Sequence, residues 1–244
     1  MEGTEPVVPY VSMGAIFVAA VVAAWLLRGR SWAAVIGVLA WLPQVAYFGV
    51  EVIVVSATTA PYDPLSQPMS DLGVTGCGTD TYPLADHAIC SPMHPLMNWT
   101  MAVSGALVAA GALLVRSRLP RGYRSTAAMW LLVVFGGSSA LAGVIPADID
   151  FVWHVAVSLP GMVVQVPAFF LLGRSLRSKR PGLAAWSYLC GWSTVVSLAL
   201  LALQPILELP GGLIQRALYG IVFVWCGGMA ATLLRDRGVT GAGA

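Results

Sequence analysis

The stretch MAVSGALVAAGALLV, residues 101–115, contains no charged residue and decides the fold class. A helix rises about 1.5 Å per residue, so about 20 apolar residues cross a hydrocarbon core of about 30 Å. The stretch therefore predicts a membrane-spanning helix over residues 94–115. The whole chain of 244 residues shares this character, because 58% of it is hydrophobic, only 10% is charged, and its mean hydropathy is +0.80. A soluble domain is about 25% charged, so we expect a single transmembrane domain over residues 1–244.

Apolar runs of similar length recur along the chain, separated by short polar breaks. We therefore predict an all-α integral membrane protein, a bundle of about seven transmembrane helices. Residues 57–93 are rich in proline, which predicts a mostly irregular loop that acts as a lid or a binding element. The expected spans are residues 11–28, 33–56, 94–115, 126–145, 152–173, 184–204 and 213–234.

The charged residues divide between the two ends of these spans. All Lys and Arg residues except Arg216 fall in the breaks RGRS, RSRLPRGYR and RSLRSKRPG or in the C-terminal tail. All acidic residues except Asp236 fall towards the opposite end. Because cytoplasmic loops carry an excess of Lys and Arg, we expect the N-terminus outside, the C-terminus in the cytoplasm and the loop 57–93 to be extracytoplasmic.

Polar side chains inside the predicted spans recur at helical spacing. Residues three or four positions apart share one helix face, and a polar face avoids lipid by turning towards the bundle interior. Most of these residues fall in the outer half of their spans, which predicts a cavity with a polar mouth that opens towards the outer leaflet. The stripes contain Gln44, Tyr47 and Glu51; His94, Asn98 and Gly105; His154, Ser158 and Gln165; Ser193, Ser197 and Gln204; and Gln215, Arg216 and Tyr219.

Two acidic residues are candidates for a proton donor in this cavity. Glu51 lies about 6 Å inside the outer end of its span. Partial burial would keep its carboxyl protonated, unless a cation such as Arg216 holds it ionised. Asp148 follows Pro146 in a short outer connection. Each residue also has a structural interpretation, Glu51 as half of an ion pair and Asp148 as a solvated loop acid.

The loop 57–93 contributes further candidates. Asp71 lies two residues before Gly73, a position that suits a turn or a helix cap. Cys77 and Cys90 could close a disulfide in an oxidising exterior, which would contribute about 3 kcal/mol. The loop is therefore expected to have a defined structure over the mouth of the cavity.

Aromatic side chains are candidates for stabilising a positively charged intermediate, although packing explains such residues more often. A ring face contributes about 0.5–2 kcal/mol to a nearby cation. The sequence contains no Walker loop, GxGxxG, HExxH, CxxC or DDxxD motif. We therefore expect no metal and no other cofactor, and no nucleic acid among the partners. The aromatic candidates are Tyr47, Trp99, Trp153, Tyr219 and Trp225.

Four segments carry a resemblance to a known family: YDPLSQPMSDLGV at 62–74, SPMHPLMN at 91–98, PADIDFVWH at 146–154 and GGLIQRALYGIVFVW at 211–225. In order and spacing the chain beyond residue 35 resembles the prokaryotic membrane family called domain of unknown function 998. The resemblance implies a multi-pass protein of the bacterial plasma membrane. It also points to a set of site residues, Asp71, Asp148, His154, Gln215 and Arg216.

Members of this family in natural-product gene clusters look like membrane terpene cyclases that act on epoxidised farnesyl conjugates. The resemblance therefore implies a membrane-embedded meroterpenoid cyclase, in which Glu51 or Asp148 protonates an epoxide or alkene of a lipophilic isoprenoid substrate. His154 or a second carboxylate such as Asp71 would take the final proton, and Asn98 would contact the substrate. The expected partners are this bilayer-borne small molecule and lipid. The alternatives are a non-enzymatic lipid-binding or regulatory membrane protein and a small transporter.

Overall fold

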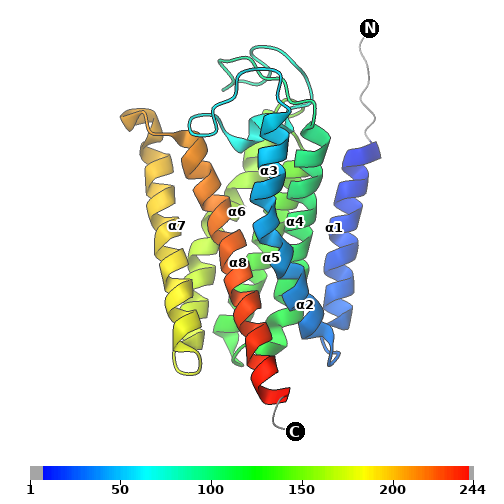
Figure 1. Cartoon of the computed structure of the whole chain (residues 1–244), viewed down its shortest axis with the longest axis vertical. Coiled ribbons are helices and arrows are strands. Elements are labelled where there is room, and N and C mark those ends of the chain that lie inside the picture. The colour runs from blue at the N-terminus through cyan, green and yellow to red at the C-terminus, as the bar shows by residue number, and fades with distance from the viewer. Residues whose placement is uncertain (1–7, 242–244) are drawn as a thin grey trace.

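The computed structural model describes residues 8–241, and side chains from residue 10 to 235. Seven helical segments are long and apolar enough to cross a membrane, which confirms the predicted all-α fold, and no strand occurs within residues 8–241. The elements are α1 (Val8–Leu27), α2 (Ala33–Trp41), η1 (Leu42–Ala46), α3 (Tyr47–Ser56), η2 (Met69–Gly73), α4 (His94–Val115), η3 (Arg116–Arg118), α5 (Tyr123–Val144), α6 (Phe151–Leu176), α7 (Pro181–Leu207) and α8 (Gly211–Gly241) (Figure 1).

The second span, residues 33–56, is not one continuous α-helix. It consists of α2, the 3₁₀ segment η1 and α3, with Pro43 at the start of η1. Proline has no backbone N–H and its ring clashes with the preceding turn, so the helix tightens there. Pro160 and Pro167, in contrast, lie inside α6, which continues through both.

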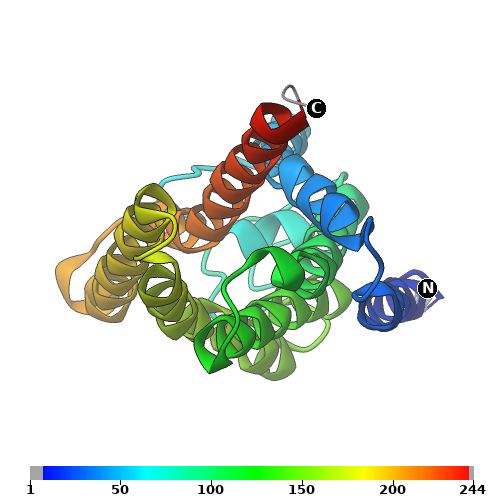
Figure 2. The same ribbon diagram turned by 90° about the horizontal axis from the view of Figure 1, so that it is seen from below.

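Helix α4 is the most buried span and packs extensively against α5, whereas α1 and α7 are the least buried and lie at the periphery (Figure 2). Glycines make the central contact close. A Cβ atom at Gly105 would overlap the carbonyl oxygen of Gly136, and a Cβ at Gly143 would overlap that of Asn98. Small residues let helix backbones approach in this way in membranes.

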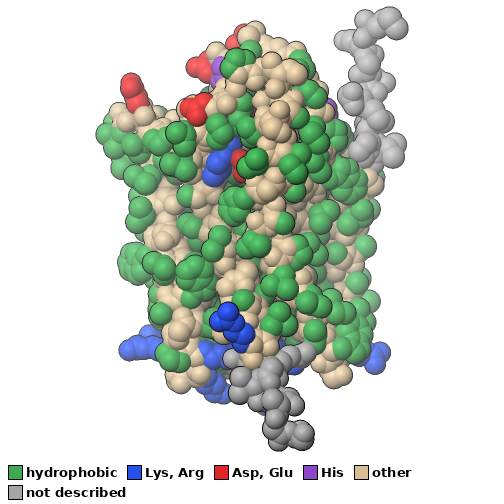
Figure 3. All heavy atoms as spheres, in the orientation of Figure 1, with side chains coloured by type: hydrophobic (Ala, Val, Ile, Leu, Met, Phe, Trp, Pro, Cys, Tyr) green, Lys and Arg blue, Asp and Glu red, His purple; other side chains and the backbone are tan. Residues whose placement is uncertain are grey.

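The two ends of the bundle differ in charge. We call the end that carries residues 57–93 the loop end and the opposite end the basic end. Acidic side chains gather at the loop end and Lys and Arg side chains at the basic end (Figure 3). Between them, the middle of the bundle contains a cluster of fully buried aromatic rings, Trp41, Phe135, Phe169, Phe223 and Trp225.

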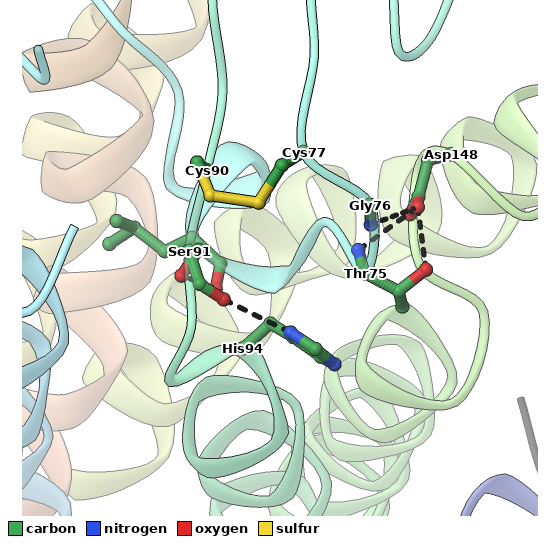
Figure 4. Close-up of a disulfide and its surroundings, with 8 residues drawn as sticks. Thr75, Gly76, Cys77, Cys90, Ser91, His94 and Asp148 are labelled. Carbon is green, nitrogen blue, oxygen red and sulfur yellow. Dashed lines mark hydrogen bonds between the residues drawn. A yellow bond between two sulfur atoms is a disulfide. The ribbon is translucent and has the colours of Figure 1, made fainter. Parts of the chain in front are cut away.

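The loop 57–93 is folded over the loop end. Cys77 and Cys90 form a disulfide (Figure 4), and Gly78 and Ile89 exchange two backbone hydrogen bonds of 3.0 and 2.8 Å. The Ser91 hydroxyl donates a hydrogen bond of 2.8 Å to the Leu72 carbonyl. The loop is therefore a structured roof despite its many prolines.

Candidate functional site

A cavity of about 990 Å³ lies between the roof and the loop-end halves of α4 to α8. No Lys or Arg is among its lining residues. Polar residues of the roof line the mouth of the cavity: Tyr62, Asp63, Ser66, Gln67, Ser70, Tyr82, Asp86 and His87. Helix residues line the interior: Met97, Asn98, Met101, Phe151, His154, Val155, Ser158, Leu159, Met162, Leu201, Gln204, Gln215 and Tyr219.

The cavity exists because α7 packs along only part of its length. Its buried residues run from Leu183 to Ser197, and none follows in the last ten residues, up to Leu207. In that last part, Leu201 and Gln204 face the cavity. Leu159 of α6 also lines the cavity while half of its surface is exposed, at 51%. Leu159 lies about 12 Å along α6 from the loop end, so the cavity reaches at least this far into the bundle.

Arg216 of α8 anchors the roof. Its Nε donates to Glu51 Oε1 at 2.5 Å, and its other nitrogens donate to the carbonyls of Pro64 and Gln67 at 2.6 and 2.9 Å and to the Tyr62 hydroxyl. The side chains of Glu51 and Arg216 are only 8% and 12% exposed. This geometry matches the ion-pair interpretation of Glu51. Neither residue lines the cavity.

Gln215, next to Arg216, contacts the roof and also lines the cavity. Its Oε1 accepts a hydrogen bond of 2.7 Å from the backbone N–H of Met69, at the start of η2. The same side chain lines the cavity. The Gln-Arg pair at the start of α8 thus ties the last helix to the middle of the loop.

Asp148 anchors the other side of the roof. One of its carboxylate oxygens accepts hydrogen bonds from the Thr75 N–H and hydroxyl at 2.9 and 2.7 Å and from the Gly76 N–H at 3.1 Å (Figure 4). The neighbouring Asp150 caps α6 by accepting from the Trp153 N–H at 3.0 Å. Asp148 does not line the cavity, so its proton-donor role would require a change of structure.

Asp71 belongs to a chain of polar contacts along the cavity wall. It accepts a hydrogen bond from the Tyr82 hydroxyl, and its second oxygen lies 2.8 Å from His87 Nε2. The other ring nitrogen of His87 lies 3.1 Å from the exposed Asp86 carboxylate. Tyr82 and His87 line the cavity, whereas the buried Asp71 lies behind them.

The Asp71–His87 pair retains its protons to higher pH than the separate groups would. Burial raises the pKa of Asp71, despite hydrogen bonds from Tyr82 and His87 that lower it. Partial burial lowers the pKa of His87, but hydrogen bonding and the charges of Asp71 and Asp86 outweigh it and raise that pKa overall. The pair is thus a proton-holding group beside the cavity.

His154 presents a hydrogen-bond acceptor to the cavity. Its Nδ1 lies 2.6 Å from the carbonyl oxygen of Ile145. A carbonyl can only accept, so Nδ1 carries the hydrogen and, in the neutral ring, Nε2 is the acceptor. Ser158 donates to the His154 carbonyl at 2.7 Å, and Asn98 donates to the Gly73 carbonyl at 2.9 Å. All three side chains line the cavity.

The structure brings together only part of the predicted site. Asn98, His154, Gln215 and Tyr219 line the cavity, whereas the other eight predicted residues do not: Glu51, Asp71, Asp148, Tyr47, Trp99, Trp153, Arg216 and Trp225. Trp225 is fully buried and donates to Ser187 at 3.1 Å, and Tyr47 is buried with its hydroxyl 3.9 Å from the sulfurs of Met69 and Met97. Trp153 is 61% exposed on the outside of α6.

Sequence reasoning missed the apolar floor and the aromatic and histidine groups of the roof. Met97, Met101 and Met162 line the cavity from α4 and α6, and Tyr82 and His87 line it from the loop. Met101 lies three residues after Asn98 and Met162 four after Ser158, so the polar stripes themselves could have pointed to these two methionines. Nothing in the spacing of the loop indicated that Tyr82 and His87 approach Asp71.

No group of three or more His, Cys, Asp or Glu residues suitable for a metal ion occurs within the described residues. Residues 43–232 match a family described as "Protein of unknown function (DUF998)". The matched segment contains the roof and all the residues that line the cavity. No curated protein and no solved structure matches the chain.

Proposed function

The chain belongs to the DUF998 family, and we propose that it binds a neutral lipophilic small molecule of the isoprenoid type in its cavity, as a multi-pass protein of the bacterial plasma membrane. The observation that carries this proposal is the cavity of about 990 Å³, with an apolar floor, a polar mouth and no Lys or Arg in its lining. Ligand pockets are typically 300–1,000 Å³, mostly apolar, with a few oriented polar groups. A phosphate group would find no Lys or Arg there.

The charge distribution supports an orientation with the loop end outside the cell. Cytoplasmic ends carry the excess of Lys and Arg, and these residues gather at the basic end (Figure 3). The Cys77–Cys90 disulfide supports the same orientation independently, because disulfides persist in oxidising compartments. The cavity would then lie at the level of the outer leaflet.

The loosely packed end of α7, where none of residues 198–207 is buried, supports entry of the ligand from the bilayer. A lipophilic molecule partitions into the membrane first, so a path between α6 and the loosely packed end of α7 avoids passage through water. Transport across the membrane is less well supported, because the buried rings of Phe135, Phe169 and Trp225 fill the bundle below the cavity.

Binding can be tested by photo-crosslinking with a farnesyl-type lipid that carries a diazirine. Wild-type protein in liposomes should label on α6 to α8, and Leu201→Trp, which fills the cavity, should reduce labelling about tenfold. The matched control is Leu203→Trp on the same helix, because Leu203 is 43% exposed and does not line the cavity. Equal labelling of the two variants would contradict the proposal.

A second candidate function is a protonation-initiated terpene cyclase, and the Asp71–His87 pair beside the cavity that His154 also lines favours it. His87, which lines the cavity in front of Asp71, would protonate an epoxide oxygen, the C–O bond would open, and the alkenes would attack the resulting carbon cation. His154 Nε2 would then remove a proton from carbon, so the reaction is a net isomerisation that needs no co-reactant. Tyr219 and the methionines of the floor would surround the cation with polarisable groups.

Glu51 and Asp148, the acids expected from the sequence, hold the roof instead of donating a proton in the cavity.

The cyclase function can be tested by turnover. Membranes that contain the protein should convert an epoxy-farnesyl conjugate to an isomer of equal mass. General acid–base groups contribute about 10²–10⁴-fold, so Asp71→Asn and His154→Gln should each lower turnover by at least 100-fold. If both variants leave turnover intact, this second function is wrong and the binding proposal is unaffected.

A further inference from the structure

The basic end contains a second, smaller pocket that the proposed function does not use. It has a volume of about 680 Å³ and lies between the turn that precedes α5 and the turn that joins α6 to α7. Both turns lie at the end of the bundle seen from below in Figure 2. We call it the basic pocket; its lining residues are Ser117, Arg118, Leu119, Pro120, Arg121, Gly122, Tyr123, Arg124, Arg174, Ser175, Ser178, Lys179 and Arg180.

Positive charge concentrates in the lining of the basic pocket. Its lining contains six Lys and Arg residues and no Asp or Glu. Arg121, Arg174 and Lys179 are exposed, while Arg124 and Arg180 are partly buried. The positive-inside rule explains the presence of arginines at this end of the bundle, but not their arrangement around a concave site.

Two helix N-termini lie beside the same pocket: Tyr123 and Arg124 of α5 line it, and Arg180, which precedes α7, lines it as well. Helix α5 begins after Gly122 and α7 begins after Arg180, and neither has a side-chain cap or an acidic residue in its first turn. The first backbone N–H groups of a helix lack acceptors within the helix and carry partial positive charge, which makes such an end an anion site. These helices contain 22 and 27 residues, so each has a full macrodipole.

The turn before α5 is held in a fixed shape. Arg116 donates to the carbonyls of Pro120 and Gly122 at 3.4 and 3.3 Å and to the Thr126 hydroxyl at 2.9 and 3.1 Å. Gly122 has a φ of +131°, which side-chain-bearing residues rarely adopt. On the other wall, the hydroxyls of Ser125 and Ser175 are 2.6 Å apart and join α5 to α6. The pocket is thus pre-organised before any ligand arrives.

We propose that the basic pocket binds a phosphate-bearing anion, presented by an anionic phospholipid of the adjacent leaflet or by a soluble phosphate compound. Arginine pairs with phosphate oxygens through two parallel N–H donors, and basic pockets between membrane helices suit anionic lipid headgroups. The site is independent of the cavity at the loop end. The two pockets therefore differ in chemistry, because one has no Lys or Arg in its lining and the other has six.

The test measures lipid binding to the purified full chain by native mass spectrometry. Phosphatidylglycerol should bind at least tenfold more tightly than phosphatidylcholine. Each Lys or Arg near a membrane surface strengthens binding of anionic lipid roughly fivefold, so the double variant R121Q/R174Q should lose at least tenfold in affinity for phosphatidylglycerol. Ser178→Glu, which adds a carboxylate to the pocket and removes no cation, should cause a similar loss.

The matched control is R30Q/R177Q, which removes two exposed arginines from the same end without touching the pocket lining. It should change the affinity less than twofold. Inorganic phosphate separates the sources of the anion: if phosphate binds to the wild type, is lost in R121Q/R174Q, and no lipid preference exists, the ligand is soluble. Equal losses in the control and pocket variants, or binding of neither phosphate nor phosphatidylglycerol, would overturn the proposal.

Discussion

The loop end and the middle of the bundle are stabilised by different interactions. In the middle, aromatic rings pack against one another, with the Trp41–Trp225 and Phe169–Trp225 centroids both 5.3 Å apart. At the loop end, hydrogen bonds and ion pairs connect segments far apart in the sequence, such as Met69 with Gln215. Apolar packing fixes the helices, and polar contacts fix the roof. The difference implies that global stability and the shape of the cavity can be changed separately.

Substitutions can test whether the loop end and the middle of the bundle are stabilised separately, and the largest effect is expected at Arg216. Arg216→Leu leaves the buried Glu51 carboxylate without its partner and frees the roof carbonyls of Pro64 and Gln67. Removing one member of a buried ion pair costs about 3–5 kcal/mol. Chemical unfolding in detergent measures this loss, and the double variant E51Q/R216L should recover part of it. A loss below about 1 kcal/mol would mean that the roof is held by other contacts.

Trp225→Ala should destabilise the protein almost as much without disturbing the roof. Trp225 is fully buried between Trp41 and Phe169, and large-to-small substitution of such an aromatic residue costs about 3–5 kcal/mol. Unfolding should shift, whereas protease digestion of the loop 57–93 under native conditions should stay at the wild-type rate. Faster cleavage of the loop at native conditions would show that the two regions are coupled.

Asp148→Asn should have a smaller and local effect. The amide keeps the shape but loses the charge on the oxygen that accepts three hydrogen bonds from Thr75 and Gly76. Hydrogen bonds to charged groups contribute about 1.5–3 kcal/mol, so hydrogen exchange near Thr75 should accelerate while global unfolding changes little. Asp150→Asn, which affects only the cap of α6, is the control. Equal exchange in both variants would contradict the anchoring role.

The smallest effect is a pH dependence of the roof. The pKa of His87 is raised above its usual 6.5, and that of Asp71 is raised as well. A group whose pKa is higher in the folded state contributes stability that is complete below the unfolded pKa and lost as the pH rises through the folded one. Loop exchange, corrected for intrinsic rates, should therefore increase above about pH 6.5. His87→Gln should flatten this dependence; a slope that remains would place its origin elsewhere.

The fold could be predicted from the sequence because lipid imposes strong constraints on the chain. The length and hydropathy of runs such as residues 101–115 are enough to define a span, and the seven observed helical segments follow the expected ranges. The break at Pro43 was missed, since a proline inside a span can be either tolerated, as Pro160 is, or disruptive. The difference depends on neighbouring contacts that the sequence does not display.

The site was only partly predictable. Helical periodicity pointed to Asn98, His154, Gln215 and Tyr219, because positions on one face of a helix follow from spacing. Sequence reasoning named Arg216 as a possible partner of Glu51 but could not choose between the catalytic and structural interpretations, and it could not predict how the loop brings Thr75 to Asp148. A buried acid can be either a structural anchor or a catalyst. Only the position of its partner distinguishes the two roles.

The hydrogen bonds between Arg216 and the roof have a consequence for the synthesis of the protein. Arg216 follows Gln67, whose carbonyl it binds, by 149 residues. At typical rates of translation, the loop is therefore synthesised on the order of ten seconds before Arg216. A nascent or truncated chain that ends before α8 lacks the contacts of Gln215 and Arg216 and holds its roof only through Asp148, Asn98 and the disulfide.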